Sequence, residues 1–240
     1  MSSKSILVTG ASSDIGILLT QSLLKKGYRV TGHYGSNAAG LKKLESPQLC
    51  LVQADLTNFE QAKSLVEKSI EHWGSLDGLV NMIGPLEFKD LLDVTPERWR
   101  QMIELNLNVA FTMTHYAQSA LIASKGNVIN FAYAGVEDVR AWRMATSYAA
   151  AKAGIAILTK SFASALAVKG VRVNAVAPGY IDFGAFSKED TAQILKQMPQ
   201  GRMGQPGEVV DVVHWLLDGS PSYVNGAIIP VAGAWEHAVE

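Results

Sequence analysis

The amino-acid sequence predicts an α/β fold, with a doubly wound parallel sheet of about seven strands and helices on both of its faces. Two observations lead to this prediction. Short apolar runs of strand length alternate along the chain with longer segments whose apolar residues recur at helical spacing. A glycine-containing turn joins the first of these runs directly to the first helical segment. The length of 240 residues suits one large domain, so we expect residues 1–240 to fold as a single unit.

The predicted strands are short apolar runs bounded by turn residues. They are expected at residues 5–9, 28–33, 49–53, 78–81, 126–131, 171–176 and 227–231. Helices are expected between them, and Thr95 and Pro96 mark the start of one, because an N-cap hydroxyl and a proline in the first turn both favour helix initiation. This helix should continue past Asn106. Residues 182–207 contain several glycines and prolines and are expected to form an irregular loop, of a kind that often serves as a lid.

The first turn, Gly10-Ala-Ser-Ser-Asp-Ile-Gly16, lies between a predicted strand and a predicted helix. Such a turn lets backbone N–H groups approach a pyrophosphate, and the helix N-terminus adds partial positive charge. The same residues would also suit a plain turn in which glycine only supplies an unusual φ. The second strand ends in residues 33–37, His-Tyr-Gly-Ser-Asn, which include no carboxylate to bind ribose hydroxyls. This absence favours a cofactor with a 2′-phosphate, although the arginine that usually binds such a phosphate is missing too.

A tyrosine and a lysine stand four residues apart in Tyr148-Ala-Ala-Ala-Lys152. On a helix this spacing places both side chains on one face, one turn apart. A nearby positive charge favours the phenolate and lowers the pKa of the phenol, which is ordinarily near ~10. The pair is therefore a candidate proton donor and acceptor. Taken alone, the spacing also fits two residues that share a helix by accident.

Charge and cysteine content narrow the range of partners. The formal net charge of −1 gives no reason to expect nucleic acid or an acidic membrane as a partner. Cys50 is the only cysteine, so no internal disulfide can form, and a reducing compartment suits the chain. No stretch reads as a signal peptide or membrane span, and the histidines lack metal-ligand spacing. We therefore expect a cytoplasmic protein without a bound metal.

Several further motifs occur in one order along the chain. They are Thr9-Gly10-Ala-Ser-Ser-Asp14-Ile-Gly16, Asp55-Leu56, Asn81-Met-Ile-Gly84, Leu105-Asn106-Leu107, Tyr148-Ala-Ala-Ala-Lys152, Asn174-Ala-Val-Ala-Pro178-Gly179 and Gly201-Arg202-Met-Gly204-Gln-Pro206. Each match is weak alone, but the ordered set resembles the short-chain dehydrogenase/reductase family from residue 5 to about residue 231. The likeness extends in part to 3-oxoacyl-acyl-carrier-protein reductases and to pteridine reductases. The resemblance implies a Rossmann-like, NAD(P)-binding fold.

The resemblance also implies an oxidoreductase that transfers hydride from NAD(P)H to a small carbonyl substrate of the ketone or 3-oxoacyl type. Tyr148 would protonate the developing oxyanion. Lys152 would lower the pKa of Tyr148 and hold the nicotinamide ribose, and Asn106 would anchor a water that relays protons to Lys152. The residues implied to bind the cofactor are Gly10, Ser12, Ser13, Asp14, Ile15, Gly16, Tyr34, Ser36, Asp55, Leu56, Asn81, Gly84, Tyr148, Lys152, Pro178, Gly179 and Ile181.

The expected cofactor is NADP, with NAD as the alternative, and the expected substrate is a small molecule. In the resembled family the helix after Thr95 and the helix holding Tyr148 form a four-helix contact between subunits. The resemblance therefore implies a homo-oligomer, either a tetramer or a dimer. Both helical segments are apolar on more than one face, which is compatible with burial on two sides.

Several positions depart from the family's pattern. Asp14 replaces the middle glycine of the turn, where a carboxylate suits a helix N-terminus but repels a phosphate. No serine or threonine follows the fifth strand, where the family has its catalytic serine. Tyr133 aligns best with that position, fifteen residues before Tyr148. Its phenol could donate a hydrogen bond to a substrate carbonyl, or its ring could simply pack, and the sequence favours neither interpretation.

These departures leave other hypotheses open. Pteridine reductases also depart at the middle glycine and at the serine, and they often carry a His-Tyr pair like His33-Tyr34. A cofactor-binding protein that has lost catalysis is a third hypothesis, because Phe183 also stands where a threonine often binds the carboxamide. Asp138, in the lengthened loop, is either an additional proton donor or, more simply, a solvated acid.

Overall fold

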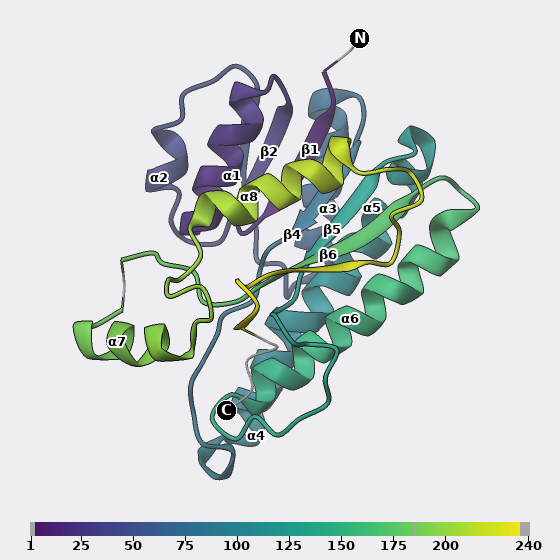
Figure 1. Ribbon diagram of the computed structural model, residues 1–240. Coiled ribbons are helices and arrows are strands. Elements are labelled where there is room, and N and C mark those ends of the chain that lie inside the picture. Colours follow the sequence, from purple (N-terminus) through teal and green to yellow (C-terminus); the bar gives the residue numbers. More distant parts are fainter. Residues whose placement is uncertain (1–2, 185, 236–240) are drawn as a thin grey trace.

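The computed structural model describes residues 3–184 and 186–235. Its centre is a parallel sheet of seven strands in the order β3-β2-β1-β4-β5-β6-β7 (Figure 1). The strands are β1 (Ser5–Thr9), β2 (Arg29–Tyr34), β3 (Leu49–Gln53), β4 (Gly78–Asn81), β5 (Asn127–Phe131), β6 (Arg172–Pro178) and β7 (Ile228–Val231). The predicted parallel sheet is therefore confirmed, and no strand end differs from its predicted position by more than two residues.

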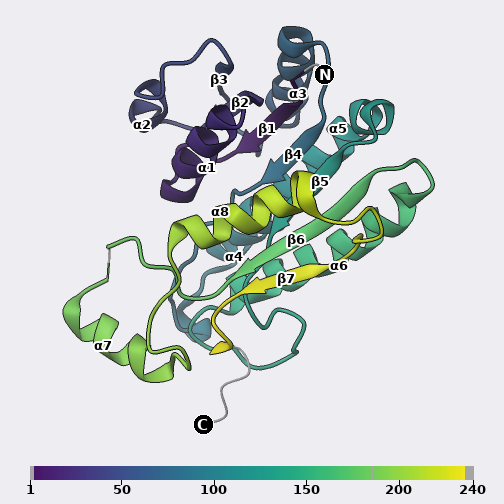
Figure 2. The same ribbon diagram turned by 45° about the horizontal axis from the view of Figure 1, so that its top comes forward.

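Helices cover both faces of this sheet, as predicted (Figure 2). They are α1 (Asp14–Lys25), α2 (Ala39–Lys42), α3 (Phe59–Trp73), α4 (Pro96–Ile103), α5 (Val109–Ser124), α6 (Thr146–Ala167), α7 (Lys188–Gln197) and α8 (Pro206–His214). Helices α1 and α8 share one hydrophobic core with the sheet, while α3, α5 and α6 share another on the opposite face.

Strand β1 shows why both faces are covered. Its side chains alternate, so Ile6 and Val8 pack into the core beneath α1 and α8, whereas Leu7 packs into the core beneath α3 and α5. All three side chains are buried. A strand that is buried on both sides reads as a continuous apolar run, which is the pattern that predicted it.

The order of the strands reverses between β1 and β4. From β1 the chain adds β2 and β3 in one direction, and then returns to add β4 to β7 in the other. At such a switch point the connections diverge to opposite faces and leave a crevice at the carboxyl ends of the strands, which is where ligands bind in sheets of this type. The turn after β1 and the segment after β4 both lie at this point.

The segment expected as an irregular loop, residues 182–207, contains helix α7. This part of the prediction was wrong. Ser187 accepts a hydrogen bond from the Asp190 N–H at 3.0 Å and so caps the helix, a local signal that the glycines and prolines on either side concealed. The base of the segment is closed by the Asp182 N–H, which donates to the Gly204 carbonyl oxygen at 2.8 Å. Helix α7 stands away from the sheet in Figure 1.

The helix predicted from Thr95 is also present, and Thr95 Oγ1 accepts from the Arg98 N–H at 3.2 Å. It runs through α4 into a π-helical segment, Glu104–Asn108, and then into α5, so it does continue past Asn106. Within the described ranges, no helix is both long and apolar enough to cross a membrane.

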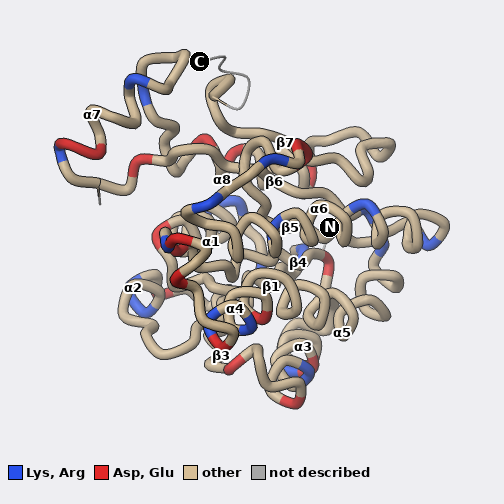
Figure 3. Tube along the Cα trace, turned by 90° about the horizontal axis from the view of Figure 1, so that it is seen from below, with Lys and Arg blue, Asp and Glu red and all other residues tan. Residues whose placement is uncertain are grey.

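Charged residues are distributed over the helices that surround the sheet, with acidic and basic positions interspersed (Figure 3). This arrangement agrees with the net charge of −1. Among the described residues, no three His, Cys, Asp or Glu side chains come together in a group that could hold a metal ion.

Candidate active site

The turn between β1 and α1 packs backbone against backbone. Gly10 has a φ of 66°, and a Cβ on Gly16 would lie 2.6 Å from the carbonyl oxygens of both Gly10 and Ala11. Only glycine therefore lets α1 begin so close to the turn. Ser13 Oγ accepts from the Gly16 N–H at 3.2 Å and donates to the Gly10 carbonyl oxygen at 3.0 Å, which caps the helix. The result is a helix N-terminus at the crevice, an arrangement that suits a phosphate.

His33, at the end of β2, holds this turn in place, a role that the sequence analysis missed. Its Nδ1 accepts from the Gly10 N–H at 3.0 Å, so its Nε2 must carry the proton that it shares with the Ala54 carbonyl oxygen at 3.0 Å. Burial lowers the pKa of His33, which keeps the ring neutral. The His33-Tyr34 pair was visible in the sequence, but the contact with Gly10 depends on how β2 pairs with β1.

A cavity of about 690 Å³ opens beside the turn, at the carboxyl ends of β2 and β3. Four residues of the predicted cofactor site, Gly10, Ser36, Asp55 and Leu56, line it. Asp55 Oδ1 accepts from the N–H and the hydroxyl of Thr57, at 3.0 and 2.7 Å, and these bonds orient its carboxylate. No lysine or arginine is among the described residues that line this cavity.

Four other predicted cofactor residues, Ser12, Gly16, Tyr34 and Asn81, line neither this cavity nor the second cavity described below. Tyr34 packs against the core beneath α1. Asn81 Nδ2 donates to Thr114 Oγ1 at 3.2 Å and to Asn130 Oδ1 at 3.0 Å, so this side chain ties β4 to α5 and β5. Direct contact of any of the predicted residues with the cofactor stays a prediction.

A second cavity, of about 420 Å³, lies on the other side of the turn. It brings together nine of the predicted residues, namely Ser13, Asp14, Ile15, Gly84, Tyr148, Lys152, Pro178, Gly179 and Ile181. Phe88, Phe183 and Phe186 add an apolar wall. The two cavities flank the glycine turn at the switch point, which is where dinucleotides bind in sheets of this type.

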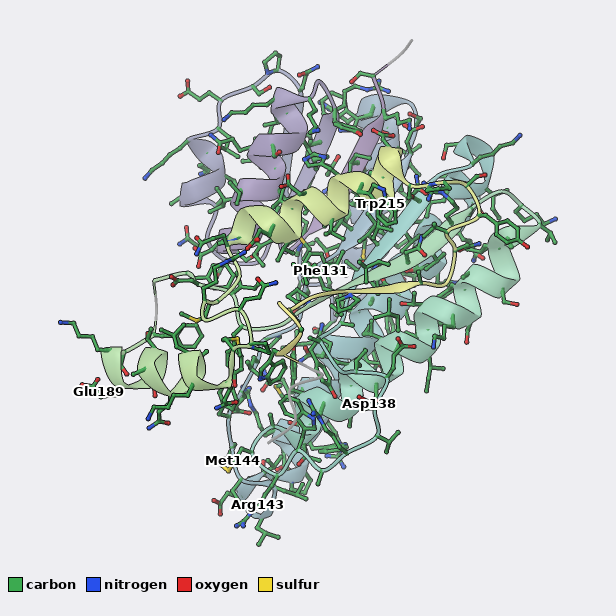
Figure 4. The ribbon with its side chains drawn as sticks, viewed as in Figure 1. Phe131, Asp138, Arg143, Met144, Glu189 and Trp215 are labelled. Atoms are coloured by element: carbon green, nitrogen blue, oxygen red, sulfur yellow. The ribbon has the colours of Figure 1, made fainter. Side chains whose placement is uncertain are left out.

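Tyr148 and Lys152 lie together in this second cavity, on one face of α6. Lys152 Nζ lies 5.7 Å from the centroid of the Tyr148 ring. It donates a hydrogen bond at 2.8 Å to the carbonyl oxygen of Phe131, which ends β5 in the middle of the molecule (Figure 4). The predicted pairing of the two side chains on one face is therefore present.

The protonation of this pair differs from the prediction. Burial lowers the pKa of Lys152 to about 7, because an ammonium group is poorly solvated in the interior. Burial also raises the pKa of Tyr148, and the neighbouring Tyr133 raises it further. The pKa of Tyr148 is therefore raised, contrary to the expectation that Lys152 lowers it, and Lys152 is not among the causes of the shift. Tyr148 is protonated at neutral pH, which is the form that can donate a proton.

Asn106 lies in the π-helical segment and is 1% exposed. Its Nδ2 donates to the Pro85 carbonyl oxygen at 3.1 Å, while its Oδ1 is buried without a partner among the described residues. A Cβ on Gly84 would lie 2.6 Å from both Asn106 Oδ1 and Lys152 Nζ. Asn106 Oδ1 and Lys152 Nζ thus both approach the backbone of Gly84, where only a glycine leaves them room.

Tyr133 lies beside Tyr148, with their ring centroids 6.0 Å apart. It also packs edge-on against Trp142 at 5.0 Å. All three rings line a third cavity of about 90 Å³. The Tyr133 ring therefore packs against Trp142 and also lies next to the Tyr148 phenol. A hydrogen bond from Tyr133 to a substrate stays a prediction. Asp138 is exposed in the loop between β5 and α6 (Figure 4).

Comparisons with known proteins agree with this geometry. The model of a family described as enoyl-(acyl carrier protein) reductase matches residues 10–234. Nodulation protein G of Azospirillum brasilense is 34% identical over 97% of this chain and 98% of its own. A 3-oxoacyl-acyl-carrier-protein reductase of Staphylococcus aureus is 32% identical over 96% of this chain and 97% of its own. Cyclohexanol dehydrogenase of an Acinetobacter species is 32% identical over 97% of this chain and 94% of its own.

Solved structures show the same architecture. A crystal structure described as that of a short-chain alcohol dehydrogenase from Sinorhizobium meliloti 1021 superposes with a TM-score of 0.90 and 26% identity. The alignment covers 100% of this chain and 98% of the other. The fold, the glycine turn and the tyrosine–lysine pair, together with relatives matched over almost their whole length, show that the chain belongs to the short-chain dehydrogenase/reductase family of NAD(P)-dependent oxidoreductases.

Proposed function

We propose that this enzyme reduces a small carbonyl compound, of the ketone or 3-oxoacyl type, with Tyr148 as the general acid. The observation that carries the proposal is that Lys152 and Asn106 converge on Gly84, in a cavity beside the glycine turn that Tyr148 also lines. The names of the relatives support the substrate class, because they include a 3-oxoacyl-acyl-carrier-protein reductase, an acetoacetyl-CoA reductase and a cyclohexanol dehydrogenase.

The residues of the second cavity have distinct parts in the proposed reaction. When bound, the nicotinamide cofactor supplies the hydride that forms the new C–H bond. Tyr148 donates its proton to the carbonyl oxygen as negative charge develops there, and burial keeps it protonated until that moment. The ammonium form of Lys152 then stabilises the tyrosinate. The unpartnered Asn106 Oδ1 positions a water through which Lys152 is reprotonated.

The residues around the turn also suggest how the cofactor is bound. The N-terminus of α1 and the backbone of Gly10 to Ser13 would hold the pyrophosphate. The ends of β2 and β3 would hold the adenosine. The absence of a carboxylate after β2 supports NADP, with NAD as the alternative, and Ser36 is the polar side chain of that segment that lines the adenosine cavity. Calorimetric titration with NADPH and NADH side by side tests this preference, and tighter binding of NADH would reverse it.

The central test is Tyr148→Phe, which removes the proposed acid and keeps the ring. We expect turnover to fall by at least about a hundredfold, because positioned proton transfer contributes that much or more. Cofactor affinity, measured by calorimetry, should stay within about threefold. The matched control is Tyr223→Phe, since Tyr223 is 99% exposed. Unchanged turnover in Tyr148→Phe would refute the assigned acid.

The substrate panel should also separate the alternatives. It should contain ketones, 3-oxoacyl thioesters, dihydropterins and a 2-enoyl thioester, the last because the matching family is described as an enoyl reductase. Exclusive turnover of dihydropterins or of the enoyl thioester would replace the proposed carbonyl reduction. Cofactor binding without turnover of any member of the panel would support the hypothesis of lost catalysis.

We also propose a homo-oligomer built on helices α5 and α6, and a cytoplasmic location. The outer surface of these helices exposes large apolar side chains, among them Phe111 at 47% and Ile157 at 67%. Exposed apolar surface of this kind favours a subunit contact. A single cysteine and a requirement for reduced cofactor both suit the cytoplasm.

A further inference from the structure

The loop between β5 and α6 holds one arginine against two indole rings. The guanidinium carbon of Arg140 lies 5.3 Å from the centroid of the Trp142 ring and 5.9 Å from that of Trp235. Such cation–π contacts orient a guanidinium without neutralising its charge. Both indoles line the cavity of about 90 Å³ that Tyr133 and Tyr148 also line. Arg140 therefore contacts two side chains that line the same cavity as the Tyr148 phenol.

The charges around Arg140 leave it available to an anion. Nearby carboxylates already have partners at 2.5 to 2.8 Å, in the pairs Glu87–Arg98, Asp90–Arg143 and Glu137–Lys160. Arg140 forms no ion pair with another described residue. Asp138 is the remaining acid of this loop. Burial raises the pKa of Tyr133, the charge of Arg140 lowers it, and the charge of Asp138 raises it by less than Arg140 lowers it. Of the two charges that act on this phenol, the positive charge of Arg140 is therefore the stronger.

The cavity wall itself presents hydrogen-bond donors. Its polar side-chain groups are three phenols and two indoles, and no carboxylate is among the described residues that line it. The indole N–H of Trp142 is buried and has no acceptor in the described part of the chain. An unpaired buried donor costs about 1–3 kcal/mol, so an acceptor carried by a ligand would relieve that cost.

We propose that the substrate is an oxo acid and that Arg140 binds its carboxylate. This inference rests on the proposed carbonyl reduction. The carbonyl lies at Tyr148, and the chain runs past the Tyr133 and Trp142 rings, whose centroids are 5.0 Å apart, to the guanidinium. The cavity beside these rings is only about 90 Å³, which suits an unbranched chain, and the span from Tyr148 to Arg140 sets the length of that chain. Arg140 sets specificity and takes no part in proton or hydride transfer.

The experiment compares a series of oxo acids of increasing chain length with their methyl esters. For at least one chain length, wild-type kcat/KM should favour the acid by about tenfold or more, as expected for a charged hydrogen bond. Arg140→Gln should abolish this preference through a higher KM for the acid, with the ester unaffected. Arg140→Lys should retain part of it. Arg143→Gln is the matched control, because this arginine is 72% exposed at the lower edge of the molecule, three residues further along the same loop (Figure 4).

A second measurement needs no variant. In the wild-type enzyme the preference for acid over ester should fall as ionic strength rises, because salt screens an exposed ion pair. A preference that salt does not change would overturn the inference.

The outcomes separate this inference from the proposed function. No reduction of any acid, ester or neutral ketone would refute carbonyl reduction itself. Equal kcat/KM for acids and esters in the wild type, or an equal loss for both in Arg140→Gln, would overturn the role of Arg140 and leave carbonyl reduction standing. A dependence on Arg140 that appears only with a coenzyme A thioester would assign the bound anion to the phosphates of the carrier, and would overturn the oxo-acid assignment.

Discussion

Burial of Lys152 disfavours the ammonium form of its side chain, which the proposed reaction needs. The amine is 3% exposed, and burial lowers its pKa to about 7. An ordinary lysine, with a pKa near ~10.4, would be fully charged at neutral pH, whereas this one is divided between its two forms. Both forms would serve the proposed role, in which Lys152 stabilises a tyrosinate and then passes on a proton. This proposed chemistry would explain why an amine is buried at this position.

This pKa predicts the pH dependence of reduction. A lysine is charged below its pKa, so the stabilising ammonium is present at low pH and is lost as pH rises through about 7. We therefore expect kcat/KM for carbonyl reduction to fall with rising pH around that value. In Lys152→Met the residual activity should be lower and should lack this break. A break that persists in Lys152→Met would assign the titration to another group.

Gly84 carries a second prediction for a single residue. A Cβ there would lie 2.6 Å from Asn106 Oδ1 and Lys152 Nζ, so one of these polar groups must move in Gly84→Ala. We expect turnover to fall by about tenfold or more, because a displacement of that size disturbs catalytic geometry. The thermal unfolding midpoint should change little, since the ends of two side chains can shift.

The control for Gly84→Ala is Gly207→Ala. An added Cβ at Gly207 would meet nothing within 4 Å. This substitution should leave turnover unchanged, and it should not lower the unfolding midpoint, because Gly207 lies in the first turn of α8 and alanine has the better helix propensity. Equal losses in the two variants would show that the space between Asn106 and Lys152 is not the cause.

Among the elements, the π-helical segment Glu104–Asn108 positions Asn106. A π-helical turn adds a residue to a helix and often occurs at functional sites. Here it rests on α6, because a Cβ on Gly154 would lie 2.7 Å from Leu107 Cδ2. The closeness of α6 to this segment therefore depends on a glycine, one turn or less along the helix from Lys152.

We expect Gly154→Ala to push the π-helical segment away and to lower both activity and stability. Overpacking costs about 1–3 kcal/mol, and the better helix propensity of alanine offsets up to ~1 kcal/mol of this. Urea unfolding and kcat measure the two effects. Leu107→Ala should make room for the new methyl group, so a double-mutant cycle should show a favourable coupling of about 1 kcal/mol. Strict additivity of the two substitutions would contradict the contact.

For the whole molecule, the apolar outer surface of α5 and α6 predicts an assembly. Ile157→Glu places a charge in the proposed contact, where an unpaired buried charge is unfavourable. Size-exclusion chromatography with light scattering should show an oligomer for the wild type and smaller species for the variant. Val168→Glu, at the C-terminal end of α6 and 87% exposed, is the control and should remain assembled. A monomeric wild type would refute the proposed contact.

Much of the fold could be predicted because its signals are local. Strand β1 is a run of five residues buried on both faces. The start of α4 is marked by Thr95, whose side chain accepts a hydrogen bond from the Arg98 N–H, and by Pro96 in the first turn. The spacing of Tyr148 and Lys152 likewise needs only the geometry of one helix. Helix α7 was not predicted, although Ser187 caps it. The capping signal covers only four residues, and the glycines and prolines on both sides favoured the prediction of a loop.

The sequence alone determined the parallel sheet, the glycine turn and the tyrosine–lysine pair, since each follows from periodicity or spacing within a single segment. Only the tertiary structure decided the protonation of Tyr148 and Lys152, the hold of His33 on Gly10, and the place of Arg140 between Trp142 and Trp235. Each of these features depends on at least one group that is distant in the chain. Desolvation and contact depend on everything packed around a group, and no single segment contains that information.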